Sequence, residues 1–139
     1  MYKAKNTSPV LSTSFHQWSH LPIALELGHE MLTLYLLAKT LTDSSHGGVV
    51  DLDVEAFSSK LRSRPEFIVK RFEALDEYGL IFDPETHELF CSESIEQQLP
   101  VDDEKMMAYL HSILDLARNV ESDDIRQAIL AFIRDSGIY

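Results

Sequence analysis

Apolar positions repeat with a helical period in the first half of the chain. From Leu27 to Leu41 they recur every three or four residues, which predicts a buried helix. A loop rich in Ser and Gly follows, and Val49–Leu52 is a short run typical of a β-strand. For residues 1–26 we expect an arm. Its aromatic residues either fold back onto the domain or belong to a partly ordered tail.

Local signals between residues 53 and 91 predict two helices and a hairpin. Asp53 is a favourable N-cap for a two-turn helix, and Pro65 suits the first position of a second helix, which Gly79 ends. Two strands, Leu80–Phe82 and Glu88–Cys91, then flank a turn. This order predicts a winged helix-turn-helix domain over residues 27–97.

Residues 98–139 have the pattern of two amphipathic helices, which acidic residues open. Their apolar faces hold more hydrophobic surface than an isolated helix pair can hide from water. They either complete the core of the monomer, form a dimer or bind a partner. The candidate interface residues are Met106, Leu110, Ile113, Ile129, Phe132 and Ile133. The predicted fold class is therefore mainly α with a small β-sheet, a winged helix-turn-helix followed by a C-terminal helical pair.

Charge is distributed very unevenly along this acidic chain. The formal net charge is −11, but residues 73–139 contain sixteen acidic and only four basic residues. By contrast, Lys60–Arg71 contains five basic residues and one acid, Glu66. Such a local basic patch can attract phosphate while the remaining surface repels it.

The basic segment supplies the candidate DNA contacts. In a winged helix the second helix of the helix-turn-helix enters the major groove of DNA. The candidates on and before this helix are Lys60, Arg62, Arg64, Phe67, Lys70 and Arg71. The alternative is a solvated helix face that binds nothing. For His87 in the hairpin turn, the neighbouring Asp83 and Glu85 favour an ordinary turn over a contact with the minor groove.

Motifs for catalysis, metals and cofactors are not evident in the sequence. His16 and His20 have the spacing of a helical metal pair, but no third ligand lies nearby, so we expect no metal site. Cys91 is the only cysteine and is expected to be a small buried hydrophobic residue. We therefore expect that the chain is not an enzyme and binds no cofactor. Because its apolar runs are short, we expect no membrane association. Because no disulfide can form within the chain, we expect a cytoplasmic location.

Two segments resemble known DNA-binding families. The segment Glu73-Ala74-Leu75-Asp76-Glu77-Tyr78-Gly79-Leu80-Ile81 resembles the end of the recognition helix in winged-helix proteins. Met31–Leu37, together with the Gly-Gly-Val-Val entry, is similar to the N-terminal domain of phage and plasmid replication-initiation proteins of the replisome-organiser type. The resemblance covers about half of the chain. It implies that the acidic helices correspond to segments that bind other replisome proteins.

Two functions follow as hypotheses. In the first, the chain binds double-stranded DNA in phage or bacterial replication initiation or in transcription control, and its C-terminal helices form a homodimer or recruit a replisome or regulatory protein. In the second, the winged helix is a protein-interaction module with an acidic surface and no direct contact with DNA.

Overall fold

The computed structural model describes residues 22–136, which divide between Leu36 and Leu37 into two compact units.

In the first unit, residues 22–27 are helical and Gly28 interrupts the helix with a φ of 95°. Helix α2 (His29–Asp43) begins immediately afterwards. Residues 22–26, which the sequence assigned to the arm, are helical, and Ile23 among them is buried. The expectation for Phe15 and Trp18 lies outside the described residues. Glycine permits this sharp change of direction because it has no Cβ.

In the second unit, three short strands form an antiparallel sheet in the order β2-β4-β3. They are β2 (Val49–Asp51), β3 (Leu80–Asp83) and β4 (Glu88–Cys91). The short helix η1 (His46–Gly48) leads into β2. Helices α3 (Val54–Lys60), α4 (Pro65–Leu75) and η2 (Asp76–Tyr78) lie between β2 and β3 in the sequence. The predicted order of strand, two helices and hairpin is therefore observed.

Three helices follow the sheet: α5 (Ser92–Gln98), α6 (Asp103–Asn119) and α7 (Asp123–Asp135). Helix α5 was not predicted, because its seven residues are mostly polar and too few to show a clear period. The other two were predicted, and side chains cap both: Asp102 accepts from the Lys105 N–H, and Ser122 accepts from the Ile125 N–H. The fold class, mainly α with a small β-sheet, is confirmed.

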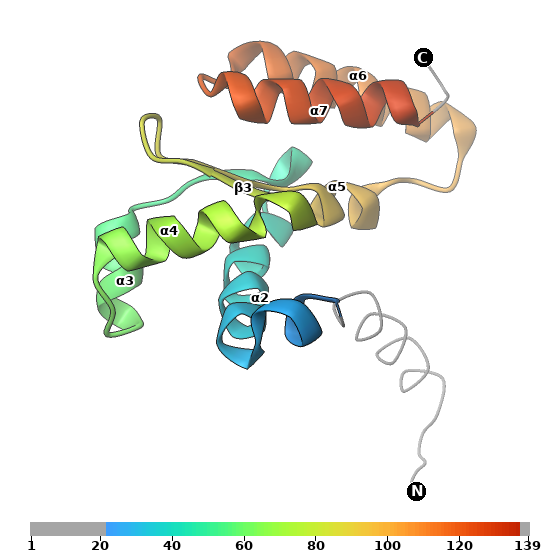
Figure 1. Ribbon diagram of the computed structural model, residues 1–139. Helices are drawn as coiled ribbons and strands as arrows, with labels where there is room; N and C mark the ends of the chain where they lie inside the picture. Colours follow the sequence, from blue (N-terminus) through green and yellow to red (C-terminus); the bar gives the residue numbers. More distant parts are fainter. Residues whose placement is uncertain (1–21, 137–139) are drawn as a thin grey trace, which may run out of the picture. The chain divides into compact units, whose positions relative to one another are not determined.

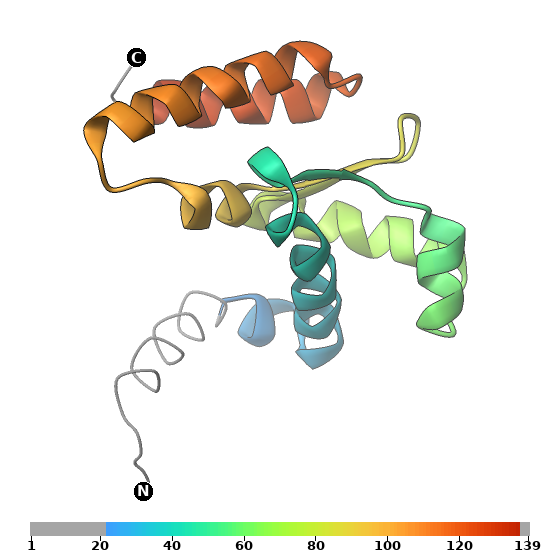
Figure 2. The same cartoon turned by 180° about the vertical axis from the view of Figure 1, so that it is seen from behind.

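The sheet is covered on both faces, by α4 on one side and by the α6–α7 pair on the other (Figures 1 and 2). Neighbouring residues of β3 point to opposite faces: Phe82 contacts Phe72 of α4, with ring centroids 5.4 Å apart, whereas Ile81 packs against the α6–α7 core. The central strand β4 is consequently buried along its whole length. Phe90 and Ile95 share one hydrophobic cluster with the C-terminal helices, so residues on both sides of position 97 belong to the same core.

Candidate nucleic-acid interface

Helix α3 and the following turn are defined by local hydrogen bonds. The Asp53 carboxylate accepts from the N–H groups of Glu55 and Ala56, each at 3.1 Å. At the other end the Ser63 N–H donates to the Ser58 carbonyl at 2.9 Å, which closes the turn. Arg62 occupies this turn with a φ of 55°, a left-handed conformation that glycine usually adopts.

Helix α4 starts at Pro65, as predicted, and buries one face in the domain. Ile68, Phe72 and Leu75 form this face. The Phe72 ring also contacts Phe57 of α3, with centroids 6.1 Å apart. This packing fixes the rotation of α4 about its axis and thereby determines which side chains face solvent.

The solvent-facing side of the first turns of α4 is basic and aromatic. Arg64, Glu66, Phe67 and Lys70 are all exposed there, and Phe67 leaves 55% of its surface accessible. Lys60 and Arg62 are exposed at the adjoining end of α3 and in the turn. We call Lys60, Arg62, Arg64, Phe67 and Lys70 the basic patch; it lies at the junction of α3 and α4 (Figure 1).

The four cations of the basic patch differ from most other cations in the described part of the chain, where only Lys105 is likewise without an ion pair. None of the four forms an ion pair with a carboxylate of residues 22–136. Elsewhere Lys39, Arg118, Arg126 and Arg134 each pair with a nearby acid. Even with the exposed Glu66 beside it, the patch therefore presents net positive charge, which is the property that phosphate binding requires.

Arg71, the remaining candidate from the sequence, is placed differently. Its side chain is only partly exposed and has an interaction partner within the chain. The reason is geometric: Arg71 is adjacent to buried Phe72 and lies between the exposed and buried faces of α4. We therefore leave it out of the basic patch.

The C-terminal end of α4 has the opposite charge. Glu73 and Glu77 are exposed, and Asp76 begins η2. The pKa of Asp76 is raised, first by partial burial and then by the nearby charge of Asp124. Only the N-terminal half of α4 is thus suited to approach an anion.

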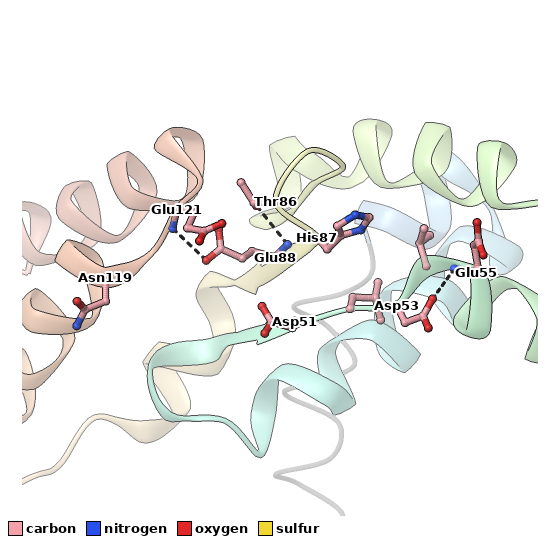
Figure 3. Close-up of a pocket in the computed structure, with 10 residues that line it drawn as sticks. Asp51, Asp53, Glu55, Thr86, His87, Glu88, Asn119 and Glu121 are labelled. Carbon is pink, nitrogen blue, oxygen red and sulfur yellow. Dashed lines mark hydrogen bonds between the residues drawn. The ribbon is translucent and has the colours of Figure 1, made fainter.

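An acidic hollow of about 820 Å³ lies next to the start of α3. Figure 3 shows its carboxylates, Asp51, Asp53, Glu55, Glu88 and Glu121, with His87 among them. Glu88 is largely buried, and its two oxygens accept from the N–H groups of Glu121 (3.1 Å) and Ser122 (2.7 Å). This carboxylate therefore joins the hairpin to the α6–α7 turn.

The hairpin tip lies in strongly acidic surroundings. Asp83 and Glu85 line a second hollow together with Glu121, Asp123 and Asp124 of the α6–α7 turn. The pKa of Asp83 is lowered, mainly by a hydrogen bond from the Ser122 side chain. His87 is exposed, with a φ of 65°, within this acidic region. The sequence revealed the acids of the hairpin and of the α7 cap, but not that the fold brings them together.

Most of the candidate interface residues of the C-terminal helices lie in the core. Leu110, Ile113, Ile129 and Ile133 are buried in the same cluster as Phe90. A partner could reach them only after the domain unpacked. The other two, Met106 and Phe132, are partly exposed and line a groove described below.

A hydrogen-bonding contact links Ser112 of α6 to His46 of η1. The Ser112 Oγ lies 3.0 Å from His46 Nε2, and the same hydroxyl donates to the Tyr109 carbonyl at 2.6 Å.

Residues 22–136 contain no cluster of three or more His, Cys, Asp or Glu residues that could hold a metal ion. His16 and His20 lie outside these residues, and Cys91 is buried as expected. Across the same range, no helix is long and apolar enough to cross a membrane.

The sequence matches no protein-family model, and neither curated proteins nor solved structures show a significant match.

Proposed function

We propose that this chain is a DNA-binding protein of the winged helix-turn-helix type. The observation that carries the proposal is the basic patch: four exposed and unpaired cations around an exposed phenylalanine, on the helix-turn-helix of a chain with net charge −11.

The contacts follow from the placement of the patch. Lys60, Arg62 and Arg64 neutralise phosphates of the DNA backbone, and the first two turns of α4 enter the major groove. There Lys70 reaches base edges or phosphate, while Phe67 offers an apolar surface of the kind that contacts a thymine methyl group. The C-terminal end of α4 and the hairpin tip are acidic and would be repelled by phosphate. We therefore expect a small contact area on DNA that does not include the β3–β4 hairpin, the wing of this fold.

Replication initiation and transcription control both fit this binding mode. The resemblance of Met31–Leu37 and the Gly-Gly-Val-Val entry to replication-initiation domains supports the first. The C-terminal helices then connect the DNA-bound domain to a second copy or to a replisome or regulatory protein. On this proposal the chain is not an enzyme and acts in the cytoplasm.

A specific observation favours a second candidate, a protein-interaction module. Two acidic hollows flank the hairpin, and both would repel phosphate. A partner with a basic face would fit this side of the domain without any contact between α4 and DNA.

Hydrogen–deuterium exchange with a mixed-sequence duplex at about 50 mM salt separates the two candidates, because phosphate contacts are strongest at low salt. The DNA-binding proposal predicts protection in the α3–α4 turn and the first half of α4, with none at the hairpin tip. Exchange that is unchanged by saturating duplex would favour the interaction module.

A further inference from the structure

A groove between α5 and α7 lies apart from the basic patch. Its volume is about 750 Å³, within the range of ligand-binding clefts. It is lined by Leu99, Met106, Ala128, Ala131 and Phe132, with Ser92, Glu96, Asp135 and Ser136 at its edges.

The side of α7 that lines this groove has helical spacing. Ala128, Ala131, Phe132 and Asp135 follow the i, i+3, i+4, i+7 pattern, whereas Ile125, Ile129 and Ile133 point into the core. Helix α7 thus has two apolar sides: one is buried in the core, and the other packs against the core only in part and stays partly exposed. The stretch from Ala128 to Asp135 rises roughly 10 Å, or two helical turns.

The shape of the groove suits another helix. Two alanines on its α7 wall allow a close approach of a helix backbone, and Met106 and Leu99 add apolar surface to the lining. Methionine adapts to different apolar side chains and is common at surfaces that bind helices. Val101, in the segment between α5 and α6, is fully exposed.

The acidic residues at the edges of the groove favour a positively charged binding partner. Glu96 and Asp135 stand on the edges, in a half of the chain with net charge −12. Two copies that met groove to groove would bring these carboxylates together, which is unfavourable. A helix with an apolar stripe and flanking Lys or Arg residues is complementary in both respects.

We propose that the groove formed by α5, α6 and α7 binds an amphipathic basic helix of a partner protein. The bound helix lies along α7, with its apolar side chains against Met106 and Phe132 and its cations beside Glu96 and Asp135. The α3–α4 junction, which carries the basic patch, lies at the opposite end of this unit from α5 (Figures 1 and 2), so both surfaces can be occupied at once. The inference does not depend on DNA binding.

The test uses a fluorescein-labelled peptide of about 16 residues, with leucines at helical i, i+3, i+4, i+7 spacing and lysines elsewhere. A peptide of the same composition but without an apolar stripe is the control. Fluorescence anisotropy measures both against the full chain. We expect saturable binding of the patterned peptide, at least about tenfold tighter than that of the control peptide.

Two pairs of variants locate the site. Ala131→Trp fills the groove, whereas Ala108→Trp adds the same ring on the exposed side of α6. Glu96→Lys reverses an edge charge, whereas Glu104→Lys reverses an acid outside the groove. We expect the first member of each pair to weaken binding about tenfold or more and the second to change it little. Thermal unfolding shows whether each variant is folded, and Glu96→Lys, at an exposed site, is a test that does not depend on filling the groove.

Three results would overturn the proposal. The first is no binding of the patterned peptide, and the second is binding no tighter than that of the control peptide. The third is an equal loss of affinity for the patterned peptide in both variants of each pair. Equal losses would indicate general attraction to an acidic surface. A concentration-dependent increase in mass in light scattering that Ala131→Trp abolishes would assign the groove to a second copy instead.

Discussion

The Glu88 carboxylate accepts hydrogen bonds from two successive backbone amides, those of Glu121 and Ser122, at 3.1 and 2.7 Å. Glu88 is on the central strand, and the two amides belong to the turn between α6 and α7. Among residues 22–136 no cation forms an ion pair with Glu88. The buried carboxylate accepts from these N–H groups and connects the hairpin to the C-terminal helices.

Glu88→Gln should therefore destabilise the domain by about 1–3 kcal/mol, because a neutral amide cannot accept at both of its terminal atoms. Chemical denaturation measures the loss. Glu85→Gln, in the exposed hairpin turn, is the matched control and should have little effect. Equal stability of Glu88→Gln and the unsubstituted chain would show that the contact contributes nothing.

Ionisation of Asp83 should depend on Ser122. The side-chain hydrogen bond from Ser122, followed by backbone N–H groups of Glu85 and Thr86, lowers the pKa of Asp83 below its ordinary value of 3.8, although partial burial opposes this. The charged form is thus favoured in the folded state. Its stabilising contribution is present above the ordinary pKa and is lost as the pH falls through the lowered value.

NMR titration of the Asp83 carboxyl tests this directly. In Ser122→Ala the pKa should move upward towards the ordinary value. Ser122→Ala also removes the cap of α7, so the titration, which reports on Asp83 alone, is a better readout than stability. An unchanged pKa in the variant would rule out Ser122 as the cause.

Asp76 should respond in the opposite direction. Partial burial and the charge of Asp124 raise its pKa, so the charged form is disfavoured in the folded state. Asp76→Asn should therefore increase stability at neutral pH. The advantage should shrink as the pH falls through the raised pKa towards the ordinary value, because the native side chain is then also neutral. Denaturation at several pH values measures this, and a gain that does not vary with pH would contradict it.

Arg62 offers a way to separate folding from binding. Its left-handed conformation costs roughly 1 kcal/mol for a residue with a Cβ and nothing comparable for glycine. Arg62→Gly should thus raise the melting temperature while it weakens DNA binding. Arg62→Asn, which tolerates this conformation and also lacks the charge, is the companion variant. Lower stability of the glycine variant would show that the arginine side chain stabilises the turn.

The elements that could be predicted from the sequence are those with strong local signals. Asp53, Pro65 and Gly79 mark helix ends through their own backbone chemistry, and α4 shows a clear apolar period. Residues 22–26 and α5 were missed because each helical stretch is too short to show a clear period. Helix α5 is fixed in part by hydrogen bonds that are remote in sequence, such as those of Ser94 with Thr42 and Asp43.

The candidate site was predictable only in part, for a similar reason. A run of basic residues is visible in the sequence, but the burial of Phe72 decides that Lys70 faces outward and that Arg71 does so only in part. The acidic hollows depend on the approach of Glu121 and Asp123 to the hairpin, across more than thirty intervening residues. The burial of Ile113 and Ile129 likewise follows from packing on the sheet.

The most direct test of the central claim is the salt dependence of binding to a mixed-sequence duplex, measured by fluorescence anisotropy. We predict saturable binding that weakens steeply with salt. In the double variant Arg64→Ala/Lys70→Ala, the slope of log K against log salt should be less steep by about two units. The reason is that each phosphate contact contributes roughly 0.9 to the magnitude of this slope. Lys105→Ala/Arg118→Ala removes the same charge outside the basic patch and should leave the slope unchanged. Absence of binding at about 50 mM salt, or an equal change of slope in both double variants, would contradict the account.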